Sequence, residues 1–198
     1  MCARASASAF NDAYRGTPPW DIGRPQPAFR SLGDANALHG RVLDAGCGTG
    51  EHALMAAALG FDATGIDGAP LAIEKAAAKA RERGVAVRFI VGDVLELAPF
   101  GEEWDTVLDC GMFHVLDDED RARYVESLAS VIARGGRYFM LCFSDREPGD
   151  IGPRRVSREE IRDAFADGWQ VVSIEASVIE TTFEDRDVHA WFATITRV

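Results

Sequence analysis

Three glycines and an aspartate, placed at the ends of short apolar runs, are the residues of this sequence best suited to holding a ligand. Gly46, Gly48 and Gly50 alternate in the run LDAGCGTGEH (43–52). Glycine adopts positive φ readily and lets the backbone approach a ligand closely. Asp67 ends the next apolar run, FDATGID, at the position where an acid accepts hydrogen bonds from both hydroxyls of a ribose. This spacing indicates a binding site for a nucleoside.

Glu51 restricts which nucleoside this loop can hold. A nicotinamide-binding fingerprint, G-x-G-x-x-G counted from Gly46, would place its third glycine at position 51. The glutamate found there would meet the pyrophosphate of a dinucleotide, and two like charges repel. The loop therefore favours a nucleoside without phosphates. A nicotinamide-dependent oxidoreductase is the weaker alternative.

Two further acids follow the same logic of position. Asp44 stands directly before the glycines, where it can meet the amino group of an amino-acid tail. Asp93 ends the third apolar run, and an acid there can receive an adenine amino group, with Val94 against the ring. Gly68, next to Asp67, is counted with the binding residues.

Apolar runs alternate with helical patterns along the chain, which predicts the elements that must position these residues. We expect strands at 41–46, 61–67, 85–93, within 102–111, and at 136–144, 169–177 and 187–198. We expect helices at 5–14, 26–38, 51–59, 70–83, 117–134 and 157–165, the last opened by the capping box Ser157 and Glu160. Because the two final strands follow each other without a helix, they form an antiparallel hairpin at the edge of a doubly wound α/β sheet.

Composition limits the possible partners. The chain has 198 residues, of which 47% are hydrophobic, and a formal net charge of −11. This length predicts one domain over residues 1–198. Nucleic acid and anionic membranes both select a basic surface, so neither is an expected partner. A small ligand, held by a monomer or a homodimer, fits the composition better.

The cysteines and the N-terminus indicate the compartment. Cys2, Cys47, Cys110 and Cys142 show no C-x-x-C pairing or regular spacing, which predicts reduced thiols and no metal site. The N-terminal residues lack the apolar core of a signal peptide. We therefore expect a cytoplasmic protein.

The residues Asp44-Ala45-Gly46-Cys47-Gly48-Thr49-Gly50, Asp67 and Gly92-Asp93-Val94 resemble the class I S-adenosylmethionine-dependent methyltransferases, over about residues 40–198. The resemblance implies a Rossmann-like sheet of seven strands, mostly parallel with an antiparallel last strand and helices on both faces. It also implies S-adenosyl-L-methionine as cofactor, whose cationic sulfonium and ammonium groups suit acidic neighbours. Cys47 in the glycine loop and Cys110 after the fourth strand would then border the cofactor without reacting.

Residues 1–39 precede the first strand and include the proline-rich run TPPWDIGRPQPAF (17–29). Prolines fix an extended path at little entropic cost, and Trp20 offers a broad apolar surface with one donor. The run from Tyr14 to Arg24 resembles the N-terminal motif of the thiopurine and thiol/halide methyltransferases, which implies that Trp20 covers the active site as a lid. The alternative is a hydrophobic plug between the N-terminal helix and the sheet.

His114, in LDCGMFHVLDDED (108–120), is the candidate general base, because its ordinary pKa lies near working pH. It could instead pack at the start of a helix and order the loop. Residues 110–113 read CGMF rather than the Asn/Asp-Pro-Pro-Tyr motif of DNA adenine methyltransferases, which again disfavours a nucleic acid substrate.

The sequence thus predicts an enzyme that transfers a methyl group from S-adenosylmethionine to a small molecule. Aromatic residues near the site favour an aromatic or heterocyclic O, N or S nucleophile as acceptor. Small thiols or halides are the alternative that the Trp-Asp-Ile-Gly run favours, and a cofactor-binding protein without turnover is a further one.

Overall fold

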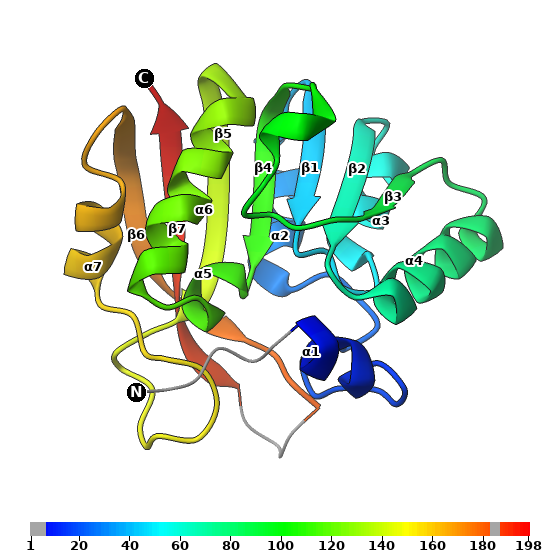
Figure 1. Cartoon of the computed structure of the whole chain (residues 1–198), viewed down its shortest axis with the longest axis horizontal. Helices are drawn as coiled ribbons and strands as arrows, with labels where there is room; N and C mark the ends of the chain where they lie inside the picture. Colours follow the sequence, from blue (N-terminus) through cyan, green and yellow to red (C-terminus); the bar gives the residue numbers. More distant parts are fainter. Residues whose placement is uncertain (1–6, 183–186) are drawn as a thin grey trace.

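A seven-stranded sheet forms the centre of the computed structural model, which describes residues 7–182 and 187–198 (Figure 1). The strands are β1 (Arg41–Ala45), β2 (Asp62–Asp67), β3 (Arg88–Val91), β4 (Trp104–Cys110), β5 (Ile132–Phe143), β6 (Trp169–Ile179) and β7 (Val188–Arg197). Their order is β3-β2-β1-β4-β5-β7-β6. Strand β7 runs antiparallel to both of its neighbours, and the other pairs are parallel. The predicted Rossmann-like fold with its terminal hairpin is confirmed.

Helices connect the strands and begin at the signals that the sequence carries. They are α1 (Ala7–Ala13), α2 (Pro27–Asp34), α3 (Glu51–Ala58), α4 (Pro70–Arg83), α5 (Met112–Val115), α6 (Asp118–Val131) and α7 (Arg158–Ala164). Proline occupies the first turn of α2 and α4, where its missing N–H is not needed. The capping box of Ser157 and Glu160 is present at α7, and Asp117 caps α6.

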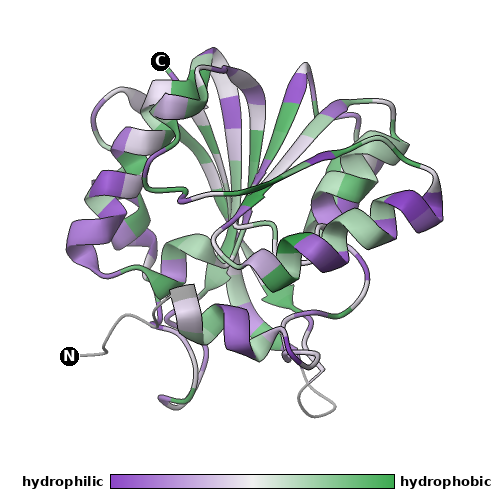
Figure 2. Ribbon diagram, turned by 45° about the vertical axis from the view of Figure 1, so that its right-hand side comes forward, coloured by the Kyte–Doolittle hydropathy of each residue, from purple (hydrophilic) through white to green (hydrophobic). Residues whose placement is uncertain are grey.

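Alternating residues of the strands build a separate apolar core on each face of the sheet. Leu43 and Val107 face α6 and α7, whereas Val42 and Leu108 face α2 and α3. Figure 1 shows α6 and α7 in front of the sheet and α2 behind it. In Figure 2 green is found along the strands between purple and white segments, and the outward helix surfaces carry purple, as expected for a sheet covered on both sides.

The strand order reverses between β1 and β4. Strand β1 pairs with β2 on one side and with β4 on the other. In open α/β sheets, ligands bind where the order reverses in this way. Figure 1 shows α1 and the loop after β5 at this end of the sheet, so these additions to the sheet lie near the carboxyl ends of β1 and β4.

Some element boundaries differ from the expected ones. Strand β3 covers only Arg88–Val91, and the chain enters β5 at Ile132, directly after α6, instead of at residue 136. The pairing of β4 with β5 is irregular between Trp104 and Thr106, and this irregularity takes up the extra residues. The short helix α5 was not expected. None of the described helices is long and apolar enough to cross a membrane.

Candidate active site

The glycine loop joins β1 to α3, and its glycines are required both by backbone conformation and by packing. Gly46, Gly48 and Gly50 have φ values of 70°, 51° and 84°, a region that side chains with a Cβ rarely adopt. A Cβ on Gly46 would lie 2.2 Å from Cγ of Met112, and one on Gly50 would lie 2.6 Å from the ring of Phe89. The loop therefore fits closely against β3 and α5.

Asp44, the last-but-one residue of β1, is a buried carboxylate with one unused oxygen. Only 1% of the residue is exposed. Its Oδ2 accepts a hydrogen bond of 3.0 Å from the Ala53 amide, while Oδ1 has no hydrogen-bond partner in the described part of the chain. Burial, opposed by that hydrogen bond, raises the pKa of Asp44 to about 7. Such an oxygen suits a cationic ligand, and the ammonium group of S-adenosylmethionine fits this requirement.

His52 lies beside Asp44 but does not neutralise it. Its Nε2 accepts a hydrogen bond of 3.2 Å from the backbone N–H of Gln26, and its Nδ1 lies 3.9 Å from Oδ1 of Asp44. Burial lowers the pKa of His52 to about 4, so the ring is neutral. The charge of an ionised Asp44 is therefore left for a ligand to compensate.

Asp67, at the end of β2, fixes the glycine loop. Its Oδ2 accepts from the Gly48 amide and its Oδ1 from the Ala69 amide, each at 2.8 Å. Burial raises the pKa of this carboxyl group as well. Each carboxylate oxygen can accept a second hydrogen bond, so ribose hydroxyls can still bind here. Gly68, which follows, is exposed.

Asp93 and Val94 lie one strand further along the same edge. The Gly92 amide donates to the Asp67 carbonyl at 3.0 Å, which ties the turn after β3 to the end of β2. Asp93 is exposed and accepts at Oδ1 from the Leu95 amide, whereas Val94 is buried. The strand order thus gathers Asp44, Asp67 and Asp93 along neighbouring strand ends, as the sequence predicts.

The cysteines near this edge are chemically quiet. Cys47 is buried against β2: its sulfur lies only 2.9 Å from where a Cβ would stand if Gly65 carried a side chain. Burial raises the pKa of Cys47 and of Cys110 well above the usual range, so both remain thiols. Cys47, Cys110 and Cys142 are all free, and the described residues contain no cluster that could hold a metal ion. Cys2 lies outside the described residues.

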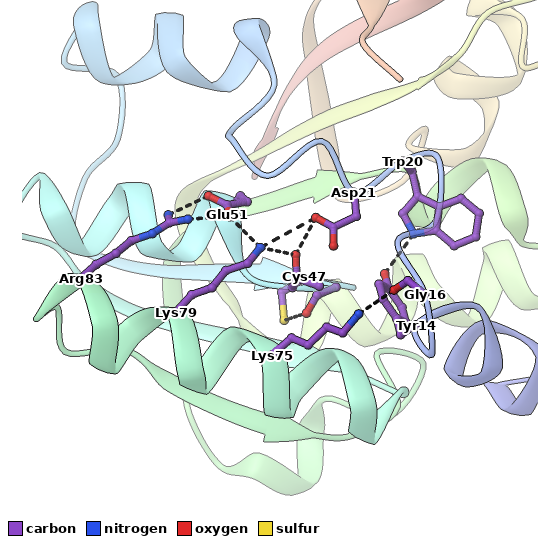
Figure 3. Close-up of polar contacts among 11 residues, drawn as sticks. Tyr14, Gly16, Trp20, Asp21, Cys47, Glu51, Lys75, Lys79 and Arg83 are labelled. Atoms are coloured by element: carbon purple, nitrogen blue, oxygen red, sulfur yellow. Dashed lines mark hydrogen bonds and ion pairs between the residues drawn. The ribbon is translucent and has the colours of Figure 1, made fainter. Parts of the chain in front are cut away.

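Residues 14–26, here called the strap, reach the glycine loop through polar contacts (Figure 3). Thr49 donates to Oδ1 of Asp21 at 2.8 Å, and Nζ of Lys79 on α4 donates to Thr49 and to Glu51 at 2.7 Å each. Arg83 also pairs with Glu51. Although burial opposes ionisation, these hydrogen bonds from Arg83 and Lys79 lower the pKa of Glu51. The glutamate that distinguishes this loop from a dinucleotide fingerprint therefore belongs to an ionic network.

Trp20 is not buried in the core. The residue is 44% exposed, and its Nε1 donates to the Tyr14 hydroxyl at 3.0 Å. Its ring meets those of Phe10 and Tyr14 edge-on, at centroid distances of 6.0 Å and 6.3 Å. The Tyr14 hydroxyl in turn lies 2.7 Å from the position of a Cβ on Gly48. This exposure argues against a hydrophobic plug and leaves the lid as a prediction.

Tyr14 is a site residue that sequence reasoning did not single out. It is buried against the glycine loop, and burial raises the pKa of its hydroxyl. Its place in the sequence, one turn before the prolines, gives no signal of this contact. The opposite end of the strap is fixed too: Gln26 exchanges two side-chain hydrogen bonds with the backbone of Glu180, at 2.8 Å and 2.9 Å.

His114 lies in α5, directly after β4, and is held from one side. Its Nδ1 accepts a hydrogen bond of 2.9 Å from the Phe143 amide of β5. Burial, followed by the guanidinium groups of Arg121 and Arg155, lowers the pKa of His114 to about 3. The ring is therefore neutral. Its Nε2 lies 3.1 Å from the position of a Cβ on Gly111, in the turn at the end of β4.

Asp109 is a second residue that the sequence did not single out. It is fully buried, and its Oδ2 accepts from the hydroxyls of Tyr138 at 2.5 Å and Tyr124 at 3.1 Å. Its Oδ1 accepts a hydrogen bond of 2.8 Å from the backbone amide of Met112, which is the first residue of α5. Burial, partly offset by the Tyr138 hydrogen bond, raises the pKa of Asp109 to about 6. This network fixes α5, and with it His114, at the sheet edge.

Comparison with known proteins shows similarity to methyltransferases. The sequence matches the family described as "Methyltransferase domain" over residues 42–136. It is 38% identical over 176 residues to the 2-heptyl-1-hydroxyquinolin-4(1H)-one methyltransferase of Mycobacteroides abscessus, covering 83% of this chain and 78% of that protein. It is 27% identical over 163 residues to probable thiol methyltransferase 2 of Arabidopsis thaliana, covering 80% and 72%. A solved structure described as "Conversion of a Disulfide Bond into a Thioacetal Group during Echinomycin Biosynthesis" superimposes with a TM-score of 0.89 at 37% identity, covering 97% of this chain and 93% of that one.

Proposed function

The chain belongs to the class I S-adenosylmethionine-dependent methyltransferases, and we propose that its acceptor is an oxygen, nitrogen or sulfur atom of a small aromatic or heterocyclic compound. The enzyme transfers a methyl group from S-adenosylmethionine to a small molecule. The observation that carries the acceptor class is the 38% identity to the hydroxyquinolinone methyltransferase. The aromatic side chains of Phe10, Tyr14 and Trp20 above the glycine loop agree with a flat acceptor.

We propose the following places for the cofactor, which supplies a methyl group on a positively charged sulfur. The free oxygen of Asp44 receives the ammonium group, and Asp67 receives the ribose hydroxyls. Asp93 receives the adenine amino group, with Val94 against the ring. The backbone of the glycine loop, with Cys47, and the positions Gly68 and Cys110 complete the binding surface.

Trp20 is proposed to be the residue of the strap that covers the site. Its ring is attached to the glycine loop through Tyr14 but keeps nearly half of its surface accessible. An acceptor or the cofactor can therefore pack against the ring. Covering the reacting atoms would exclude water, which favours a displacement in which charge is dispersed.

A small thiol or a halide is the second candidate acceptor. The similarity to probable thiol methyltransferase 2 and to a structure concerned with disulfide chemistry supports a sulfur nucleophile. We further propose the cytoplasm as the compartment, because Cys47, Cys110 and Cys142 are all free thiols. With a net charge of −11, neither nucleic acid nor an anionic membrane is a proposed partner, and a monomer or homodimer is proposed.

The test is release of S-adenosylhomocysteine by the purified protein in the presence of single acceptors. The panel holds hydroxyquinolines, N-hydroxyquinolinones, phenols, aryl thiols, heteroaryl amines, small thiols and iodide. Turnover of the heterocyclic or phenolic compounds supports the first proposal, and preferential turnover of small thiols or iodide supports the second. No turnover of any of them, by protein that still binds S-adenosylhomocysteine, contradicts both.

A further inference from the structure

The hydrogen bond at Nδ1 determines which tautomer of His114 is present. The Phe143 amide has only a proton to offer, so the Nδ1 that it contacts at 2.9 Å must be the unprotonated nitrogen. In a neutral imidazole the remaining proton then resides on Nε2. His114 therefore presents an N–H group, and no lone pair, at the side of the ring opposite β5.

This N–H group lies beside the turn at the carboxyl end of β4. Nε2 lies 3.1 Å from the position of a Cβ on Gly111, in the turn that follows β4. That turn is at the carboxyl end of β4, beside β1 and the glycine loop, where the strand order reverses. Within the described residues, Nε2 has no hydrogen-bond partner.

We propose that His114 donates a hydrogen bond from Nε2 to the acceptor atom, and that the acceptor binds already ionised, so that the enzyme uses no general base. The inference rests on the proposed function, because it concerns how the acceptor of that reaction is held. It replaces the role of base, which the residue type alone suggests, by the roles of positioning the acceptor and selecting its anionic form.

The charges around His114 agree with an anionic acceptor. Arg121, on α6, is 5% exposed, and its Nε donates to the Phe113 carbonyl at 3.0 Å. Its Nη1 is 3.4 Å from Glu160, and its Nη2 has no hydrogen-bond partner among the described residues. Arg155, from the loop after β5, is the other charged group that acts on His114. Both cations favour a negative charge nearby, in a chain whose net charge is −11.

The role of base conflicts with this geometry. To accept a proton at Nε2, the ring would have to carry its existing proton on Nδ1, which would then face the N–H group of Phe143. Two donors facing each other leave a buried amide without a partner, which is unfavourable. Protonation of both nitrogens is opposed further by burial and by the two guanidinium groups.

The reaction then balances without proton transfer in the site. The ionised acceptor atom supplies the electron pair of the new bond to the methyl carbon, and the bond between that carbon and sulfur breaks with its electron pair left on sulfur. The sulfonium becomes a neutral thioether, and the anionic acceptor becomes a neutral methyl ether, thioether or N-methyl compound. The acceptor gave up its proton to solvent before it bound.

Three substitutions of His114 test the donor separately from a base. Glutamine can place an amide N–H near the position of Nε2 but cannot accept a proton, so His114→Gln should lower kcat/KM less than about 10-fold. His114→Leu removes the donor and should lower it about 10- to 100-fold. His114→Asn offers Phe143 an acceptor but no donor toward the site, so it should fold like the wild type and match the leucine variant in activity. His39→Gln, at the amino end of β1, is the matched control.

The pH dependence of kcat/KM supplies an independent readout. At saturating S-adenosylmethionine, so that protonation of Asp44 does not limit the rate, two hydroxyquinolines with well-separated hydroxyl pKa values should give rate profiles whose acidic limbs follow the acceptor, in the wild type and in His114→Gln alike. If His114 is a base, the limb stays in place when the acceptor changes, and His114→Gln loses about 10²- to 10⁴-fold, as much as His114→Leu. That result would overturn the inference.

Folding and function are separated by two further measurements. The melting temperature and the affinity for S-adenosylhomocysteine should stay close to wild type in His114→Asn, so that a loss of activity there reports the donor. A wild type that methylates none of the heterocyclic or phenolic acceptors contradicts the proposed acceptor class. A wild type that does so, with an acceptor-independent pH limb, contradicts only the role assigned to His114.

Discussion

The two halves of the proposed site have opposite charges, and the chain builds them differently. The cofactor half consists of Asp44, the glycine loop and Asp67, at the ends of β1 and β2. Its residues lie close together in the sequence, and regular strands hold them. Asp44 is buried, Asp67 is half-buried, and burial raises the pKa of both, so each ionised carboxylate gains from a cationic ligand.

The acceptor half consists of His114, Arg121 and Arg155, carried by α5, α6 and the loop after β5. These positions meet only through tertiary contacts, such as the bond from the Phe143 amide to His114. The two charged groups that act on His114 are both cations, although the chain as a whole is acidic. A methyl group passes from a cationic sulfur to a nucleophile, so opposite charges on the two sides suit a cationic donor and an anionic acceptor.

The largest effect is expected from Asp44→Asn. Losing a buried carboxylate that pairs with an ammonium group should raise the Kd for S-adenosylhomocysteine about 100-fold or more. Because burial raises the pKa of Asp44 from 3.8 to about 7, the folded protein loses stability as the pH rises between these two values, and the whole loss is present above about pH 7. Without ligand, the free energy of unfolding of Asp44→Asn at pH 8 should therefore exceed that of the wild type by about 1–2 kcal/mol. Calorimetric titration and thermal unfolding measure both, with the exposed Asp163→Asn as control.

The opposite result for Asp44 would remove one side of the comparison. If Asp44→Asn binds the ligand as tightly as the wild type, the unused oxygen serves no cation. If instead the variant is less stable at pH 8, the acid has a structural role that outweighs its burial.

A smaller loss is expected from Asp67→Asn. The asparagine side chain has one accepting oxygen where aspartate has two, and it carries no charge. The substitution should therefore weaken S-adenosylhomocysteine binding about 10- to 100-fold, by loss of hydrogen bonds to a charged acceptor. Its bonds to the Gly48 and Ala69 amides are also disturbed, so its melting temperature should fall. Asp93→Asn is the companion variant, and because Asp93 is exposed we expect less than about a 10-fold change in Kd. Equal losses in the two variants would contradict the ranking of these acids.

The cofactor half could be predicted from the sequence because its signals are local. A glycine loop between a strand and a helix, with acids at successive strand ends, requires only the correct order of elements. The alternation of strands and helices supplied that order, including the final hairpin. Strand β3 was placed too long, because the apolar character of residues 85–93 extends beyond the four residues that pair with β2.

Of the acceptor half, only His114 could be named from the sequence. His114 was recognised from its residue type, but its tautomer depends on the amide of Phe143, which no local pattern connects to it. Asp109 accepts hydrogen bonds from the hydroxyls of Tyr124 and Tyr138, which lie on a helix and a strand that only the folded chain brings together. The strap had a recognisable composition, whereas its attachment through Gln26 to the backbone after β6 had none.

Trp20→Ala tests the proposed closure of the site by the strap. We expect kcat to fall about 10-fold, because water enters and the acceptor loses a packing surface. The melting temperature should change little, since Trp20 is 44% exposed and contributes little to the core. Trp20→Phe keeps a ring but loses the bond to the Tyr14 hydroxyl, so it separates packing from attachment. A large loss of thermal stability in Trp20→Ala would support the plug, and an unchanged kcat would contradict the lid.

The smallest effect is the pH dependence of ligand binding, and it distinguishes the acids of the cofactor half from one another. Free Asp44 takes up a proton as the pH falls through about 7, and an ammonium group binds only the ionised carboxylate. The Kd for S-adenosylhomocysteine should therefore rise a few-fold between about pH 8 and 6.5. 5′-Methylthioadenosine keeps the nucleoside and has no ammonium group, so its Kd should stay constant over this range. If Kd changes equally with pH for both ligands, the titrating group is Asp67, beside the ribose. If the Kd for S-adenosylhomocysteine still changes with pH in Asp44→Asn, Asp44 is excluded as the titrating group.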